Sequence, residues 1–377
     1  MINLIKKVFV LVFMVLLFIP LLFTNQKEDT VSEAENRVLS NKPNLYIDNR
    51  PNLHLTIDFD SWFKDNIGFR ENLIKLDAEI QYNIFHQFSD RSYKLSETGE
   101  LNYIGQQVLP NYQHINLYSN EELAEIISSF QDVNSYLKDK GIQFYYMQCW
   151  DKQSIYPEYF PKTVNQYGSF SACDQVVNAL KEQTDVYNIN LKEALLASKN
   201  EHEVYSKWGD PTHWTRRGSY IGYLQLMNSI NDHSDEQLKI LQETDYNHST
   251  EDVGQTLSGT IHFKNYSEML SLITDTSEST KDKFTIDAGD PRSTYFTNEA
   301  CDNNTRILIL GDSYIHAYIL RDISQSFHET ILLWKWNMSD LKNLVEEYHP
   351  DIIVYEQAER EQSFSPIVNA AESLKSN

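Results

Sequence analysis

From residue 120 onwards, two patterns of apolar residues alternate along the chain. Continuous apolar runs, which are typical of buried strands, lie at 142–149, 186–189, 305–310, 330–334 and 351–355. Segments with apolar residues every three or four positions, which are typical of helices, lie at 120–138, 170–182, 191–198, 215–228, 314–323 and 339–348. This alternation predicts an α/β fold with a doubly wound, mainly parallel sheet and right-handed crossovers.

Outside this alternation the pattern is less regular. Residues 58–88 have helical spacing that Gly68 interrupts, and 101–118 read as strand and loop. The helix from 120 has Asn120 as its expected N-cap, with Gly141 just beyond its end. Residues 232–300 are rich in Asp, Ser and Thr without a firm period, and we interpret them as an insertion of loops or a small lid.

The N-terminus predicts a membrane anchor. Lys6 and Lys7 precede an apolar run over 8–23, close to the ~20 residues that cross a bilayer. No Ala-x-Ala cleavage pattern follows, which favours an uncleaved anchor over a removed signal peptide. The lysines keep that end in the cytoplasm, so we expect a single-pass protein of the cell membrane with its remaining chain extracellular. A buried core helix is the alternative.

The expected organisation is therefore a transmembrane anchor over 1–24, a juxtamembrane connector over 25–57 with Pro43 and Pro51, and one extracellular domain over 58–377.

Composition excludes several functions. The net charge of −22 and the pI near 4.8 argue against nucleic acid as a partner, and against a basic patch that binds anionic membranes. Cys149, Cys173 and Cys301 are too few and too scattered for a disulfide framework or a zinc site, and we expect no essential bridge. Since no metal or nucleotide motif is visible, we expect no cofactor.

The first candidate for chemistry is Ser313. The apolar run over 305–310 stops at Gly311-Asp312-Ser313, and a helix-like segment follows. A serine on such a strand–turn–helix corner exposes its hydroxyl at the carboxyl edge of a sheet, where backbone N–H groups stabilise an oxyanion. Ser313 is thus a candidate nucleophile. The alternative is that Asp312 or Ser313 only caps the helix.

The second candidate is the pair Asp210 and His213, in the sequence Trp208-Gly209-Asp210-Pro211-Thr212-His213-Trp214. A serine nucleophile needs a base that titrates near neutral pH and a carboxylate that fixes the tautomer of that base. The Asp-x-x-His spacing lets the carboxylate reach Nδ1 while Nε2 faces a serine. The alternative is that Asp210 and Thr212 cap the following helix and that His213 is a half-buried surface residue.

Together these motifs resemble the SGNH (GDSL-type) hydrolase superfamily, in particular its alginate O-acetyltransferase-like branch, which includes the "DHHW" proteins. Weaker similarities along the chain support this: Glu35-Asn36-Arg37 with Pro43, the segment 65–70, and Lys152 with Tyr156-Pro157-Glu158. Two features depart from the pattern. The branch usually has Asp-x-His-Trp, one residue shorter than here, and the oxyanion Gly and Asn of the superfamily find no counterpart.

The resemblance implies an SGNH/flavodoxin-like fold and transfer or removal of acetyl groups on hydroxyls of an extracellular polysaccharide, through an acyl-serine. Its partners would be that cell-surface polysaccharide and a membrane-bound O-acyltransferase that donates acetyl. Ser313 would be the nucleophile, His213 the base and then acid, and Asp210 the residue that orients it.

Lys152, Tyr314 and Arg360 are candidate substrate contacts. For Arg360, a surface ion pair with Glu356 or Glu361 is the alternative. Trp150 and Trp214 would stack on sugar rings or pack in the core. A polysaccharide O-acetyl esterase, or an envelope scaffold without catalysis, remains the rival function.

Overall fold

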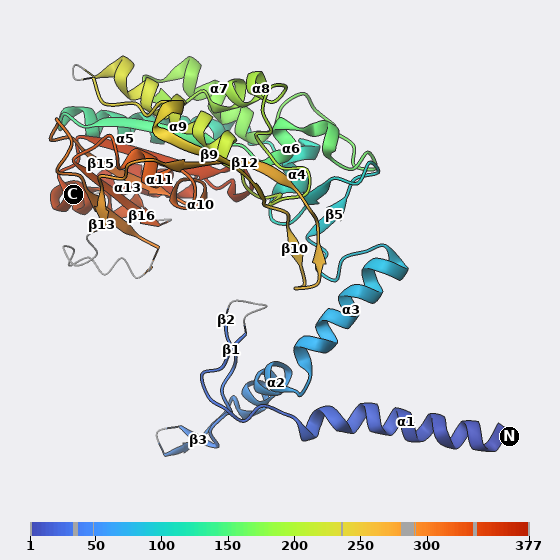
Figure 1. The fold of residues 1–377 in the computed structure, drawn as a ribbon. Coiled ribbons are helices and arrows are strands. Elements are labelled where there is room, and N and C mark those ends of the chain that lie inside the picture. Colours follow the sequence, from blue (N-terminus) through green and yellow to red (C-terminus); the bar gives the residue numbers. More distant parts are fainter. Residues whose placement is uncertain are drawn as a thin grey trace. The chain divides into compact units, whose positions relative to one another are not determined.

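The computed structural model describes residues 2–32, 37–47, 49–234, 237–279, 290, 292–334 and 338–375. The chain divides into two compact units (Figure 1). The first unit comprises Met1–Arg91 and Thr256–His262, and the second comprises Ser92–Gln255 and Phe263–Asn377. Glu35 and Asn36 of the expected family motif lie outside the described residues.

The first unit contains the apolar N-terminal helix α1 (Ile2–Leu22). Its segment Leu4–Leu22 is long and apolar enough to cross a membrane, and none of it is buried. An anchor and a signal sequence both meet this description. Two further helices, α2 (Leu55–Asn66) and α3 (Arg70–Phe85), follow. Short antiparallel pairs complete the unit: β1 (Val31–Ser32) with β2 (Arg37–Val38), β3 (Tyr46–Ile47) with β4 (Arg50–Pro51), and β10 (Thr256–Leu257) with β11 (Ile261–His262).

The predicted interruption at Gly68 is confirmed, because this residue lies in the corner between α2 and α3. Its N–H donates to the Pro20 carbonyl at 3.0 Å, and a Cβ there would lie 2.6 Å from Cβ of Phe23. The stretch after α1 also bonds to α2: the Asn25 N–H donates to the Asn66 carbonyl at 2.7 Å. The stretch after α1 is thus bonded to the residues that join α2 and α3, and the expected domain boundaries at residues 24 and 57 stay a prediction.

The second unit is built on a seven-stranded sheet in the order β13-β14-β16-β15-β17-β7-β8. Its strands are β7 (Gln143–Cys149), β8 (Tyr187–Asn188), β13 (Glu278–Ser279), β14 (Thr294–Thr297), β15 (Arg306–Gly311), β16 (Glu329–Trp334) and β17 (Ile352–Ala358). The five strands from β16 to β8 are parallel, whereas β14 pairs antiparallel with β16 and β13 antiparallel with β14. The predicted mainly parallel α/β sheet is confirmed.

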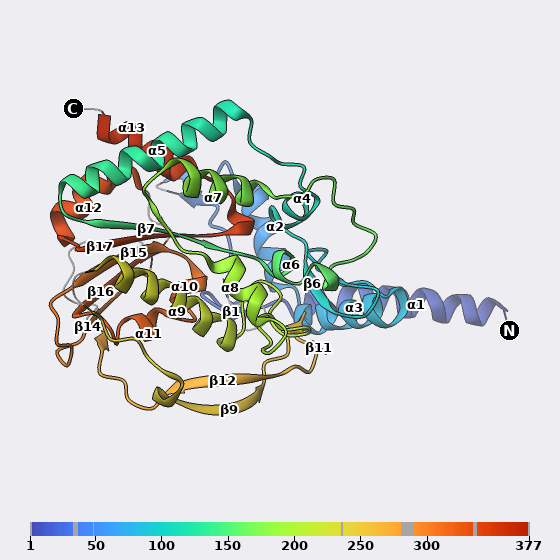
Figure 2. The ribbon, with the colours of Figure 1, turned by 90° about the horizontal axis from the view of Figure 1, so that it is seen from above.

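Helices cover both faces of this sheet (Figure 2). The helices of the second unit are α4 (Val108–Gln113), α5 (Asn120–Asp139), α6 (Lys152–Ile155), α7 (Ala172–Gln183), α8 (Leu191–Ser198), α9 (Arg216–His233), α10 (Ser313–His316), α11 (Leu320–Ile323), α12 (Leu341–Tyr348) and α13 (Ser365–Lys375). Successive strand residues face opposite sides. Ile307 and Ile309 therefore pack in one core with α8 to α11, and Leu308 and Leu310 pack in the other with α5, α12 and α13.

Several details differ from the sequence-based expectations. Residues 101–118 hold the strand β6 (Leu101–Tyr103), which pairs with β5 (Tyr93–Leu95), and also the helix α4. The helix expected at 314–323 is two short helices, α10 and α11. The insertion at 232–300 contains a ribbon of β9 (Tyr246–Asp252) with β12 (Tyr266–Leu272), besides β13 and β14 of the main sheet. Residues 235–236, 280–289 and 291 of it lie outside the described residues.

The N-cap of α5 is Ser119, so the expectation that Asn120 caps this helix is wrong. The Ser119 hydroxyl accepts from the Glu122 N–H at 3.2 Å, and the Glu122 carboxylate accepts from the Ser119 N–H at 2.8 Å. This reciprocal pair is a capping box, which satisfies two backbone donors of the first turn. Ser and Asn cap equally well, so composition alone did not distinguish the two positions.

We expect Ser119→Ala to lower the free energy of unfolding by about 1 kcal/mol, since it removes the cap hydrogen bond. Asn120→Ala is the matched control and should change it by less than about 0.5 kcal/mol. Chemical denaturation of the two variants measures the difference. Equal losses in both would contradict the capping box.

Candidate active site

Ser313 lies at the carboxyl end of β15, the fourth strand of the seven, on the turn that leads into α10. Asp312 caps α10: its carboxylate accepts from the Tyr314 N–H at 2.9 Å. The Asp312 N–H in turn donates to Glu356 Oε2 at 2.8 Å. Because Asp312 provides the cap and Ser313 does not, the hydroxyl of the half-buried Ser313 is available for another partner.

Asp210 and His213 lie on the loop that precedes α9. Asp210 Oδ1 accepts from the Thr212 N–H at 2.8 Å, which closes a tight turn, and its Oδ2 lies 2.7 Å from His213 Nδ1. The cap of α9 is Thr215, whose hydroxyl accepts from the Gly218 N–H at 3.0 Å. The alternative in which Asp210 and Thr212 cap this helix is therefore wrong.

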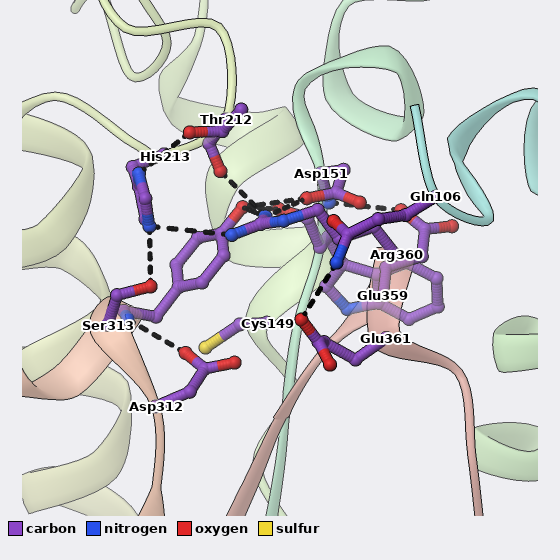
Figure 3. A network of polar contacts seen from close by, with 12 residues as sticks. Gln106, Cys149, Asp151, Thr212, His213, Asp312, Ser313, Glu359, Arg360 and Glu361 are labelled. Carbon is purple, nitrogen blue, oxygen red and sulfur yellow. Dashed lines mark hydrogen bonds and ion pairs between the residues drawn. The ribbon is translucent and has the colours of Figure 1, made fainter. Parts of the chain in front are cut away.

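The fold brings these two motifs into contact (Figure 3). His213 Nε2 lies 2.7 Å from Ser313 Oγ, although the residues are 100 positions apart in the sequence. An Nδ1–H bonded to the Asp210 carboxylate leaves Nε2 as the acceptor of the Ser313 hydroxyl proton. The carboxylate, imidazole and hydroxyl thus form one continuous chain of hydrogen bonds.

The surroundings of Asp210 favour its charged form. Desolvation by itself raises the pKa of this carboxyl, but the hydrogen bonds and charge of His213, with those of Thr212, outweigh it and lower the pKa to about 2. Tyr318 stacks on the His213 ring, with 5.4 Å between the centroids. Burial, together with the nearby Asp210 carboxylate, raises the pKa of the Tyr318 hydroxyl, which keeps it neutral.

Arg360 belongs to this site. Its Nη1 donates to Asp151 Oδ1 at 2.6 Å and to the Thr212 carbonyl at 2.7 Å, and its Nη2 lies 3.4 Å from His213 Nε2. Only 7% of the residue is exposed. The alternative of a surface ion pair with Glu356 or Glu361 is therefore wrong.

Tyr314 packs against two residues of the site, Asp151 and His213. The residue is fully buried, and its hydroxyl donates to Asp151 Oδ1 at 3.0 Å. Its ring packs against the imidazole of His213, with 5.1 Å between the centroids. In this position the side chain is closed to a ligand. Trp150 and Trp214 are likewise 2% exposed and belong to the core, as the packing alternative for these residues predicts.

Lys152 is also buried, with 1% of the residue exposed. Its Nζ donates to the Leu101 carbonyl at 2.7 Å and to the Lys207 carbonyl at 3.2 Å. These bonds join β6 to the loop that leads to Asp210. Burial lowers the pKa of Lys152 to about 7, against the opposing effect of nearby carboxylates.

Sequence reasoning missed Asp151 and Tyr318. Asp151 directly follows β7, the strand expected at 142–149, so its place at the carboxyl edge of the sheet was a usable signal. Tyr318 carried no signal, because the turn between α10 and α11 that places it was not foreseen. Cys149, Cys173 and Cys301 are free thiols, and the first two are buried.

A mainly parallel sheet with a Gly-Asp-Ser turn at the end of a central strand, facing an Asp-x-x-His loop, defines an SGNH hydrolase-like protein. The family described as "SGNH hydrolase-like domain, acetyltransferase AlgX" matches residues 111–326, more than half of the chain. The chain belongs to this family of acetyltransferases. Among curated proteins, none matches the sequence significantly.

The chain is similar to several solved structures, of which PatB1 of Bacillus cereus shows the same fold. PatB1 of Bacillus cereus with a sulfonyl adduct is similar with a TM-score of 0.53 and 17% identity, over 72% of this chain and 98% of that one. A DHHW family protein from Eubacterium siraeum is similar with a TM-score of 0.45 and 16% identity, over 69% of this chain and 90% of that one. The O-acetyltransferase domain of Pseudomonas putida AlgJ is similar with a TM-score of 0.47 and 13% identity, over 75% of this chain and 99% of that one.

The buried Lys152 makes a prediction for stability. Its pKa is about 7 when folded and about 10.4 when unfolded, so between these values the unfolded state binds more protons. Stability then rises with pH from about 7 to about 10, and is unaffected by this group below about 7. Relative to Lys152→Met, the parent should gain thermal stability between pH 7 and 9.5. Lys181 is exposed, so Lys181→Met is the control and its thermal stability should change with pH as that of the parent does. If the thermal stabilities of Lys152→Met and the parent change with pH in parallel, the burial effect on Lys152 is contradicted.

Proposed function

We propose that this protein is a membrane-anchored, extracellular O-acetyltransferase that acts on hydroxyls of a cell-envelope polysaccharide through an acyl-serine. The observation that carries the proposal is the hydrogen-bonded chain from Asp210 through His213 to Ser313. Membership of an acetyltransferase family supports acetyl as the group that is transferred. This contact also favours catalysis over the rival of a scaffold that does no chemistry.

In the first step, His213 Nε2 takes the proton of the Ser313 hydroxyl as Oγ attacks the carbonyl carbon of an acetyl donor. The donor oxygen leaves with the proton that His213 returns, and acetyl-Ser313 remains. In the second step, a sugar hydroxyl gives its proton to His213 and attacks the acyl carbon. Oγ then leaves and takes the proton back. Asp210 stabilises the imidazolium in both steps, and its low pKa keeps it ionised at neutral pH.

Each attack places negative charge on the carbonyl oxygen, which needs donors close to Ser313. The Ser313 N–H is one, as the turn position predicts. Arg360 is the second donor that we assign, because its Nη2 lies next to His213 Nε2, the atom that binds Ser313 Oγ. A guanidinium in this place takes the part that the superfamily gives to its Gly and Asn. Lys152 and Tyr314 act as supports and leave substrate contact to Arg360.

Hydrolysis and transfer share the acyl-serine, and the attacking hydroxyl distinguishes them. An anchor through α1 brings Ser313 to membrane-delivered acetyl groups at high effective concentration, which favours a transferase supplied by a membrane-bound O-acyltransferase. Part of 232–300 is our candidate for a cover that excludes water. It adjoins the site loop, since the Asn265 side chain accepts from the Trp208 N–H at 3.2 Å. A polysaccharide O-acetyl esterase is the second candidate function.

The full chain in detergent should hydrolyse 4-nitrophenyl acetate slowly. Ser313→Ala and His213→Ala should each lower the rate by at least about a thousandfold, because each removes an essential member of the chain. Ser128→Ala, on the surface of α5, should keep the parent rate. Parent rates in both site variants would exclude Ser313 as the nucleophile.

Arg360→Lys should lower kcat about 10- to 100-fold with a smaller change in KM. Lysine keeps the charge but cannot donate to Asp151, Thr212 and an oxyanion at the same time. Thermal denaturation shows whether the variant is folded. Arg292→Lys, at an exposed ion pair, is the matched control and should keep its kcat. An unchanged kcat in Arg360→Lys would remove Arg360 from the oxyanion site.

In the host, Ser313→Ala should lower the acetyl content of one envelope polysaccharide, measured after alkaline release of acetate. The proposed transferase supplies those groups, so their loss follows directly. A rise in acetyl content would instead identify the esterase. No change in any envelope glycan would favour the scaffold.

A further inference from the structure

The structure contains a buried carboxyl group next to the Gly311–Asp312 turn that precedes Ser313. Glu356 lies on β17, next to β15 in the sheet, and is 3% exposed. Its Oε2 accepts the Asp312 N–H at 2.8 Å. The same oxygen would lie 2.9 Å from a Cβ on Gly311, so any larger residue there would displace the carboxyl group from this position. One side chain therefore contacts both residues that precede Ser313.

The charged and titratable groups around Glu356 come from four elements. Asp312 lies on the turn after β15, the Cys149 thiol and the Tyr146 hydroxyl on β7, and the Arg360 guanidinium on η5 (Glu359–Glu361). The Tyr355 hydroxyl comes from β17 itself. Arg360 forms its ion pair with Asp151, and among the described residues no cation lies within 4 Å of Glu356. Burial, and then the charge of Asp312, raise the pKa of Glu356 well above its ordinary value.

We propose that Glu356 is a positioning residue for Ser313: its carboxyl group holds the Gly311–Asp312 turn in the conformation that presents Ser313 Oγ to His213. It does so in the neutral form, because a buried carboxylate beside Asp312 lacks a partner for its charge. A neutral acid serves the reaction as well. A second negative charge under Ser313 would oppose the oxyanion that each step creates. This inference rests on the proposed function.

The amide of Glu356→Gln keeps the acceptor for the Asp312 N–H, with nearly the same shape and no charge. We therefore expect kcat for 4-nitrophenyl acetate within about threefold of the parent. Glu356→Leu removes the acceptor, and should lower kcat about a hundredfold, as small displacements of a reacting group do. KM should change less. Gln357→Leu, the neighbour on the opposite face of β17, is the matched control and should keep its kcat.

Each rate is divided by the number of sites that phenylmethanesulfonyl fluoride titrates, so partial unfolding of a variant does not lower it. If Glu356 only stabilised the fold, kcat per titrated site would stay at the parent value in Glu356→Leu, and that result would overturn the proposal. Gly311→Ala is a second route, since its Cβ displaces the carboxyl group with Glu356 still present. It should lower kcat per site as Glu356→Leu does, and a parent value there would also overturn the proposal.

Infrared spectroscopy tests the neutral form directly and needs no turnover. The difference spectrum of the full-length parent minus Glu356→Gln at neutral pH should show the C=O stretch of a protonated carboxyl group. A carboxylate band in its place would overturn the neutral acid. If the parent has no esterase activity but the protonated band is present, the proposed function fails while the assignment of the buried acid stands.

Discussion

The buried ion pair between Arg360 and Asp151 is the interaction on which the site depends. It joins the chain after β17 to the chain after β7, and these segments are 209 positions apart. Arg360 also binds the Thr212 carbonyl of the histidine loop, while Asp151 accepts from the hydroxyl of Tyr314. Removing one partner of such a pair leaves an unpaired buried charge, which costs about 3–5 kcal/mol. The pair therefore fixes three loops around Ser313 at once.

The acidic residues around this pair differ in the charge state that their surroundings favour. Asp210 is held ionised by His213 and Thr212, whereas burial raises the pKa of Glu359 to about 7, with the charge of Asp151 adding to the effect. Glu359 accepts from the Asp151 N–H at 3.0 Å and from the Ser154 hydroxyl. Burial thus favours neutral acids beneath the turn loops, and hydrogen-bond donors favour a charged acid beside the histidine. In the proposed reaction, this difference puts negative charge beside the base His213 and keeps it away from the oxyanion.

The N-terminal unit has a different physical logic. The end of α1 is bonded to the corner between α2 and α3 through Pro20, Gly68 and Asn66, and Phe23 contacts Phe69 with 5.0 Å between ring centroids. The polar stretch after α1 is therefore packed against helices. Prolines and polar residues in that stretch predicted a connector. Composition does not reveal that the stretch bonds to α2, where the Asp65 carboxylate accepts from the Ser40 N–H.

The sequence by itself determined the parallel α/β class, the strand that presents Ser313, and the pairing of Asp210 with His213. These follow from local properties: the period of apolar residues, a small-residue turn, and a spacing of three positions. Only the tertiary structure decided that Ser119 and not Asn120 caps α5, and that β14 pairs antiparallel with β16. It also decided which distant residues join the site: Arg360, Asp151, Tyr318 and Glu356. Those contacts link residues far apart in the chain. They depend on the order of the strands, which no local pattern encodes.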